Sequence, residues 1–360
     1  MRRLAAAAAA VAASLVAGGC GEDEQAIPQP VDFFGVTAAD VFATNDPHYR
    51  DRSLSRMARA GVRVVRQTFD WTEIEREPGR YDFSFHDRYV ADIARKGLRL
   101  LPILFGAPTF RSAAPAGAPV LGSYPPRDEA EFARFAGVLA RRYGPGGSFW
   151  RRRPELPNLP ISSWQVWNEP NLPQYWRPEP DPRAYVRLLR ATSAAIWRVD
   201  PEAEIVAAGL PESRIGIPFA RYVTAMYDVG AKTAFDTLAV HAFGPDADAA
   251  VRAVRTARAV MRQQGDGAPL WVTELGWASE GPPSPFTVGE DGQAARVREA
   301  LQRLVDIREE LRLRGVIYFN WRDARPFRTQ RDFFGLHTGL LRRSGGAKPA
   351  LEAYRDVALP

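Results

Sequence analysis

Two glutamates stand at the ends of apolar segments that otherwise have the composition of buried strands. Glu169 ends the segment SWQVWNE (163–169), directly after Asn168, and Glu274 lies in PLWVTELGW (269–277). Two carboxyl groups can perform acid–base and nucleophilic chemistry when one stays protonated while the other is ionised. A lone glutamate at a strand end more often only starts a helix, so the functional interpretation depends on whether the fold brings both residues together.

The elements that must position these glutamates follow a regular alternation along residues 31–360. Eight apolar segments without strict polar alternation are typical of strands buried on both faces: 33–38, 62–69, 98–105, 163–169, 204–210, 236–243, 269–277 and 315–321. Between and after them lie segments of helical spacing: 51–60, 87–96, 128–143, 182–199, 219–229, 247–264, 293–314 and 348–357. The alternation predicts an α/β protein, a single (β/α)8 TIM barrel.

An open doubly wound sheet is the alternative to a barrel. Such a sheet would need a glycine-rich phosphate-binding turn after its first strand, and FFGVTAAD (33–40) is not one. The sequence also has no HExxH zinc motif, no P-loop, no GxSxG elbow and no Cys/His metal spacing. We therefore expect no cofactor and no metal.

The barrel prediction gives the two glutamates a common location. The C-terminal ends of barrel strands converge on one mouth, so the fourth strand would deliver Glu169 and the seventh Glu274 to the same pocket. Two carboxyl groups across one pocket are the arrangement that hydrolyses glycosidic bonds. One protonates the leaving oxygen, and the other attacks the sugar or activates water. Repulsion between the two charges raises the pKa of one of them.

The same residues carry a family resemblance. Asn-Glu-Pro (168–170) with Thr-Glu-Leu-Gly (273–276) resembles clan A of the retaining glycoside hydrolases, most like families 39 and 5. Three longer stretches also resemble that family: WTEIEREPGRYDF (71–83), PRDEAEFARFAGVLARRYG (126–144) and FGLHTGLLRRSGGAKPALEAY (334–354). The resemblance implies that Glu169 is the acid/base and Glu274 the nucleophile.

The resemblance also implies roles for further residues. Asn168 would bind the sugar 2-hydroxyl, Arg66 would keep the nucleophile ionised, and His241 matches the histidine of a His-x-Tyr motif. Phe243 stands where that motif has tyrosine, so a hydroxyl expected to bind the nucleophile is missing. Trp321 matches the aromatic floor of the sugar site, and Tyr318 lies nearby. As further substrate-binding residues, because aromatic rings stack on sugars, we consider Trp71, Trp176 and Trp277.

The N-terminus predicts export. Arg2 and Arg3 precede an apolar run (4–17) that is shorter than the roughly 20 residues of a membrane-spanning helix. The run leads into Val-Ala-Gly-Gly before Cys20, the chain's single cysteine, and this resembles a bacterial lipoprotein processing site. We predict a signal peptide over residues 1–20, a polar tether over 21–30 and a catalytic domain over 31–360. The protein would be lipid-anchored to the cell membrane on its extracytoplasmic face, or else simply secreted.

The sequence thus predicts a retaining glycoside hydrolase acting on an extracellular β-linked poly- or oligosaccharide. Two alternatives stay open, an inactive glycan-binding lipoprotein on the same barrel and a transglycosylase with the same residues. The net charge of +6 comes from arginines scattered among acidic residues, so we expect no nucleic-acid partner.

Overall fold

The computed structural model describes residues 32–118, 123–326 and 331–359. In them, eight parallel strands close into a barrel in sequence order. The strands are β1 Phe34–Thr37, β2 Val64–Asp70, β3 Arg99–Phe105, β4 Ser163–Val166, β5 Glu204–Pro211, β6 Thr237–His241, β7 Leu270–Leu275 and β8 Leu313–Tyr318. Each predicted apolar segment overlaps one of these strands, and the prediction of a (β/α)8 barrel is confirmed. Residues 1–31, which include Cys20 and the tether, lie outside the described residues.

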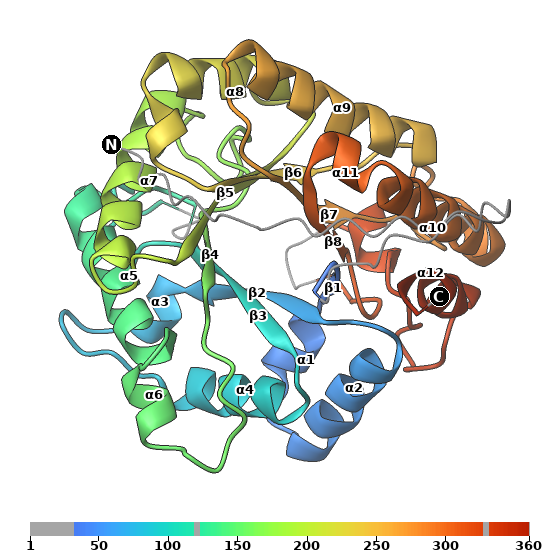
Figure 1. Cartoon of the computed structure of the whole chain (residues 1–360), viewed down its shortest axis with the longest axis horizontal. Coiled ribbons are helices and arrows are strands. Elements are labelled where there is room, and N and C mark those ends of the chain that lie inside the picture. The colour runs from blue at the N-terminus through green and yellow to red at the C-terminus, as the bar shows by residue number, and fades with distance from the viewer. Residues whose placement is uncertain (1–31, 119–122, 327–330, 360) are drawn as a thin grey trace, which may run out of the picture. The chain divides into compact units, whose positions relative to one another are not determined.

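Helices surround the barrel as an outer ring (Figure 1). The α-helices are α1 Ala39–Ala43, α2 Pro47–Arg59, α3 Trp71–Ile74, α4 Ser84–Arg95, α5 Glu129–Tyr143, α6 Ser148–Arg151, α7 Pro182–Trp197, α8 Phe219–Asp228, α9 Ala247–Gln263, α10 Gly289–Asp306, α11 Arg308–Leu311 and α12 Pro349–Ala358. Two 3-10 turns are η1 Ala231–Thr233 and η2 Phe334–His337. None of the helices in the described part of the chain has the length and apolar character needed to cross a membrane.

Aspartate caps explain where several helices begin. The side chains of Asp46, Asp128, Asp181 and Asp246 accept hydrogen bonds from backbone N–H groups in the first turns of α2, α5, α7 and α9. Each such bond satisfies a donor that the helix itself leaves free.

One predicted helix is wrong in its extent. Residues 293–314 have continuous helical spacing, but α10 ends at Asp306 and α11 at Leu311. Arg312 then adopts φ 52° and Leu313 opens β8. A left-handed conformation at a residue other than glycine carries no signal in the sequence. The chain needs it here because a strand must follow the helix directly.

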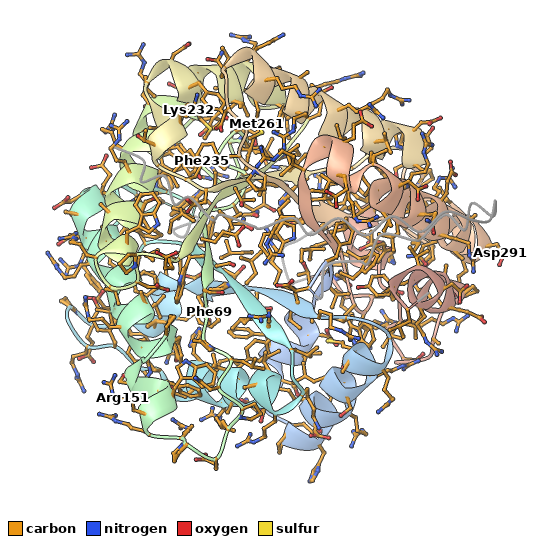
Figure 2. The ribbon with its side chains drawn as sticks, in the orientation of Figure 1. Phe69, Arg151, Lys232, Phe235, Met261 and Asp291 are labelled. Atoms are coloured by element: carbon orange, nitrogen blue, oxygen red, sulfur yellow. The ribbon has the colours of Figure 1, made fainter. Side chains whose placement is uncertain are left out.

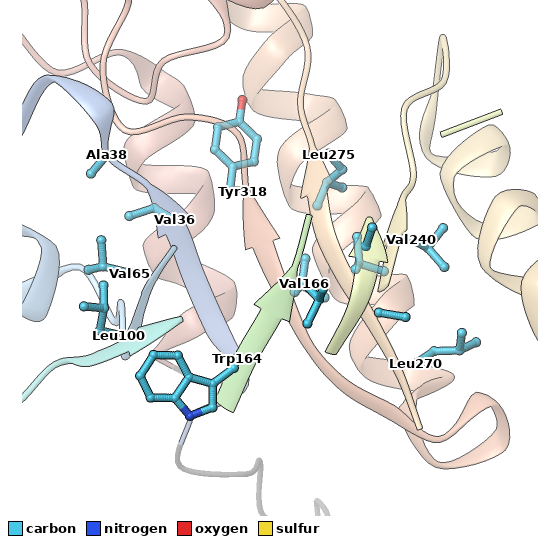
Figure 3. Packing of buried hydrophobic residues seen from close by; sticks show 14 of the residues in the cluster. Val36, Ala38, Val65, Leu100, Trp164, Val166, Val240, Leu270, Leu275 and Tyr318 are labelled. Carbon is cyan, nitrogen blue, oxygen red and sulfur yellow. The ribbon is translucent and has the colours of Figure 1, made fainter. Parts of the chain in front are cut away.

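Burial in the barrel follows the alternation of strand side chains. A small apolar cluster of Val64, Leu101, Val206, Ala239, Trp271 and Ile317 comes from the strands alone. The larger core joins the strands to the helices, and Figure 3 shows Trp164, Val166 and Val240 within it. Figure 2 shows Phe69 inside the ring of helices and Arg151 and Asp291 at the periphery.

A polar layer adjoins the apolar strand cluster, toward the C-terminal ends of the strands. Since side chains two residues apart on a strand share a face, Arg66 lies on the same side as Val64, and His241 on the same side as Ala239. Both polar residues are 1% exposed. These two buried polar side chains therefore lie toward the end where strand residues converge on the mouth.

Candidate active site

The backbone after β4 turns sharply and directs the acidic side chain into the mouth. Trp167 and Glu169 both take left-handed conformations, with φ 68° and 44°. Such backbone costs roughly 1–3 kcal/mol per residue when it is not glycine. The turn is held by neighbouring strands, because Trp167 N donates to Leu104 O at 2.9 Å and Glu169 N donates to Gly209 O at 3.1 Å. The glutamate at this strand end is thus presented to the pocket by a strained turn rather than by a helix start.

The two glutamates face each other across a narrow gap. One carboxylate oxygen of Glu169, one of Glu274 and one ring nitrogen of His241 all lie within 4.8 Å of one another. Glu169 is 8% exposed and Glu274 9% exposed, so both keep contact with solvent. Carboxyl groups about 5 Å apart suit direct attack by one of them on a sugar, whereas water-mediated inversion needs roughly 6.5–9.5 Å.

Arg66 on β2 aims its planar guanidinium at three different residues. Nη1 donates to Glu274 Oε1 at 2.6 Å, Nη2 to Asn168 Oδ1 at 2.8 Å, and Nε to Gln165 Oε1 at 2.9 Å. The ion pair with Glu274 joins residues 208 positions apart. Removing one partner of such a buried pair costs about 3–5 kcal/mol, so Arg66 holds Glu274 in place as well as supplying positive charge.

His241 links Arg66 to Glu169. Its Nδ1 lies 2.6 Å from Glu169 Oε1 and its Nε2 lies 3.3 Å from Arg66 Nη2. A guanidinium can only donate, so Nε2 must be the accepting nitrogen and Nδ1 carries the proton toward Glu169. Burial lowers the pKa of His241 to about 3, which keeps the ring neutral at ordinary pH. At Gly209 a Cβ atom would lie 2.0 Å from His241 Nε2, so glycine makes room for this ring.

Glu169 has the electrostatic environment of a general acid. Burial raises its pKa to about 8, and the charge of Arg66 opposes that shift only in part. The carboxyl group is therefore protonated near neutral pH. Because Oε1 accepts from His241, the proton belongs on Oε2. Glu274, in contrast, is ion-paired with Arg66, so the two carboxyl groups have different roles built into their surroundings.

Several aromatic residues that were expected to contact substrate are buried in the structure. Trp71 is 1% exposed, stacks on Phe135 with ring centroids 5.3 Å apart, and donates to Glu75 at 2.6 Å. Trp176 is 3% exposed and lies edge-on to Trp167. Neither ring has a face open to a sugar, because both pack between the barrel and its helices or against the loop after β4.

The remaining predicted aromatic residues are buried as well. Trp277 and Trp321 are both 0% exposed, and Trp277 Nε1 donates to Gly244 O at 2.8 Å. Tyr318 lies in the core shown in Figure 3, and its hydroxyl donates to Thr338 O at 2.9 Å. All three rings are fully buried in the structure, so a contact between any of them and substrate stays a prediction. They support the site from behind.

The aromatic rings that lie beside the site are half-buried phenylalanines. Phe243 meets the ring of His241 edge-on at 6.4 Å and packs against Phe319 and Phe334, while Phe286 stacks on Phe334 at 4.4 Å. Phe243 and Phe286 also line a cavity of about 560 Å³ that reaches His241. The sequence had pointed to Phe243 through the His-x-Tyr comparison, but Phe286, Phe319 and Phe334 carried no signal that separates them from core residues.

Gln165 and Tyr175 are two further site residues that the sequence analysis missed. Gln165 is fully buried against Arg66. Tyr175 is half-buried in the loop after β4, and its backbone oxygen accepts from Trp167 Nε1 at 2.8 Å. Burial raises the pKa of Tyr175, and the charges of Glu169 and Glu274 raise it further. Their positions on and just after the catalytic strand were the only available signal.

The cluster of Glu169, His241 and Glu274 has spacing that could hold a metal ion. Arg66 argues against that use, because its guanidinium already donates to Glu274 and approaches His241 Nε2 at 3.3 Å. A cation would have to enter beside a fixed positive charge, and Coulomb repulsion opposes this. The arrangement is better suited to moving a proton than to coordinating a metal.

Comparison with known proteins supports the barrel fold. The sequence model of a family described as Glyco_hydro_42, beta-galactosidase, matches residues 44–118. No curated protein matches the chain. Many solved structures do, although all those compared below share under 25% identity with it.

Three of these structures illustrate the likeness. A family 39 glycoside hydrolase from Bacteroides cellulosilyticus has a TM-score of 0.68 and 19% identity, over 91% of this chain and 63% of that one. A monomeric beta-xylosidase from Caulobacter crescentus has a TM-score of 0.69 and 20% identity, over 91% of this chain and 68% of that one. A family 5 protein of subfamily 18 from Bifidobacterium longum was solved with Manβ1-4GlcNAc. It has a TM-score of 0.65 and 16% identity, over 91% of this chain and 77% of that one. The chain therefore spans about two thirds of the first two proteins. The expected likeness to families 39 and 5 is confirmed for the barrel.

Proposed function

We propose that this protein is a retaining glycoside hydrolase that cleaves O-glycosidic bonds by double displacement. The observation that carries the proposal is the pair Glu169 and Glu274, whose oxygens approach within 4.8 Å in opposite electrostatic surroundings. Glu169 is the acid/base and Glu274 the nucleophile. A protonated carboxyl and an ion-paired carboxylate across one sugar-sized gap are what this reaction requires.

In the first step a Glu274 oxygen attacks the anomeric carbon while Glu169 gives its proton to the departing glycosidic oxygen. The bond from the anomeric carbon to the leaving group breaks as the bond to Glu274 forms. Esterification removes the negative charge of Glu274, so the proton affinity of the neighbouring Glu169 falls. Glu169 can then take a proton from water, and the resulting attack on the anomeric carbon releases Glu274.

Asn168 is oriented to bind the sugar beside the reacting carbon. Its Oδ1 accepts from Arg66 at 2.8 Å, so its Nδ2 donors must point elsewhere. Asn168 is half-buried, more open than Arg66, His241 or either glutamate. We assign Nδ2 to the sugar 2-hydroxyl, a contact that strengthens in the transition state of this reaction.

The substrate class we propose is an extracellular β-linked poly- or oligosaccharide. The signal-like N-terminus with Cys20 supports export and attachment to the outer face of the cell membrane. The beta-xylosidase from Caulobacter crescentus and the Manβ1-4GlcNAc complex from Bifidobacterium longum support a β-linkage. Labelling with a radioactive fatty acid, lost in Cys20→Ser, tests the anchor.

The test of the activity is a substrate panel. Protein lacking residues 1–20 is offered β-glycans and aryl glycosides, with Glu169→Gln and Glu274→Gln as controls. The proposal is supported if Glu274→Gln abolishes sugar release and Glu169→Gln strongly slows release from substrates with poor leaving groups, and NMR of the first product anomer tests retention. Glycan binding without release by the unaltered protein favours the inactive binding lipoprotein instead. Products longer than the substrate, seen by mass, favour a transglycosylase.

A further inference from the structure

Gln165 occupies an unusual place inside the barrel. It is 0% exposed on β4, and both ends of its amide are engaged. Oε1 accepts from Arg66 Nε at 2.9 Å, and Nε2 donates to Trp167 O at 2.9 Å. A guanidinium only donates and a carbonyl only accepts, so the two partners define which way the amide points. A side chain with one donor end and one acceptor end is needed to bridge them.

The first of these bonds governs how Arg66 is aimed. The guanidinium is planar and rigid, so holding Nε also sets the directions of Nη1 and Nη2. Those two nitrogens donate to Glu274 at 2.6 Å and to Asn168 at 2.8 Å. A rotated guanidinium could not keep both contacts.

The second bond supports the strained turn. Trp167 has φ 68°, a conformation that a bulky side chain rarely adopts. Its N–H is held by Leu104 O and its carbonyl by Gln165 Nε2. The next residues are Asn168 and Glu169, so this amide braces the backbone that presents the acid.

We infer that Gln165 is a positioning residue: its amide connects the turn that carries Glu169 to the Arg66 guanidinium that pairs with Glu274. Because this amide is neutral, it does not compete with Glu274 for the positive charge of Arg66. The inference rests on the proposed function. Within the described residues, the ion pairs made by Arg66 join it to Glu274 alone. A carboxylate at position 165 would compete for that charge, and it could not donate to Trp167 O.

Two variants of similar side-chain length separate geometry from charge. Gln165→Met removes both hydrogen bonds and adds no charge. We expect kcat to fall about 100-fold with KM little changed, the scale of loss that follows misplaced reacting groups. Gln165→Glu adds a like charge near Glu274, so the acidic limb of the pH profile of kcat/KM should move up by about one to two units. Gln67→Met and Gln67→Glu are matched controls, because Gln67 is also buried on a strand but makes no side-chain bond to Arg66.

The outcomes are distinct. A Gln165→Met enzyme with unchanged kcat, or a Gln165→Glu profile with an unmoved acidic limb, overturns the inference. If the unaltered protein releases no sugar, the proposed function fails. The positioning role of Gln165 is then tested separately, in the ¹⁵N NMR spectrum of the unaltered protein. There the Arg66 Nε–H should exchange slowly with solvent, and rapid exchange like that of surface arginines overturns the role. That measurement needs only the unaltered chain, so it holds even if both variants misfold.

Discussion

Two adjoining groups of residues in the barrel are built on opposite principles. The apolar cluster of Val64, Leu101, Val206, Ala239, Trp271 and Ile317 has no charge, and its members need only fill space. Two residues further along the same strands come Arg66 and His241, equally buried but charged or polar.

The difference teaches where this barrel concentrates its chemistry. An apolar residue can be replaced by another of similar volume at a cost usually below about 1.5 kcal/mol. A buried polar group instead depends on particular partners, and removing one of them leaves the others buried without a partner. The polar layer at the C-terminal ends of the strands is thus the sensitive part, and the apolar cluster is the tolerant part.

The sharpest way to break this comparison is Glu274→Gln. It removes the proposed nucleophile, and we expect kcat to fall by at least about 10⁴-fold, as for other residues that act as part of a catalytic unit. The Gln oxygen can still accept from Arg66, so the fold should survive. Steady-state kinetics with an aryl glycoside and a thermal melt measure the two effects. Substantial remaining activity would move the nucleophile elsewhere.

Arg66→Met and Leu101→Ala compare the stability of the polar layer with that of the apolar cluster. The two residues are register partners on β2 and β3. Arg66→Met leaves Glu274 buried without its partner and should cost about 3–5 kcal/mol of unfolding free energy as well as most activity. Leu101→Ala should cost about 2–5 kcal/mol through cavity formation, yet leave kcat within a few-fold. Urea unfolding and kinetics give both numbers. Equal losses of kcat would erase the distinction between the two groups.

The pH dependence sharpens the role of Glu169. Its pKa is raised from 4.5 to about 8 in the folded protein. Between those values the folded state holds a proton that the unfolded state has lost, so this group's contribution to stability falls as pH rises from about 4.5 to 8 and is level above it. The basic limb of kcat/KM should lie near pH 8. Urea titrations and rates across pH 5–9 test this.

Glu169→Gln provides the control for that prediction. The substitution should flatten the fall in stability between about pH 4.5 and 8, because the titrating group is gone. It should also slow substrates with poor leaving groups by about 10²–10⁴-fold, while aryl glycosides that need no proton lose less. A basic limb that persists in the variant would assign it to another group.

The smallest effect we expect comes from Phe243→Tyr. Phe243 meets the ring of His241 edge-on at 6.4 Å, at the position where the His-x-Tyr motif that the sequence resembles has a tyrosine. Arg66 already donates to Glu274 at 2.6 Å, so an added hydroxyl should change kcat less than tenfold, the scale of one neutral hydrogen bond. Kinetics at the pH optimum measure it. A gain of several hundred-fold would mean that the natural residue disables the site.

The sequence by itself determined the alternation of apolar strands and helices, and with it the barrel. It also predicted that Glu169 and Glu274 lie at the C-terminal ends of two strands, because strand and helix periodicities are local properties of the chain. In the structure β4 ends at Val166, so Glu169 lies in the turn that follows. Arg66 and His241 followed from the same reasoning together with a family resemblance.

Only the tertiary structure decided which side chains are open to a sugar and which are covered. Trp71 is hidden by Phe135 and Tyr318 is tied to Thr338, contacts between residues far apart in sequence. The same holds for Gln165, whose partner Arg66 is 99 positions away. Burial and the raised pKa of Glu169 arise from the summed contacts of distant segments, and no local pattern in the chain encodes that sum.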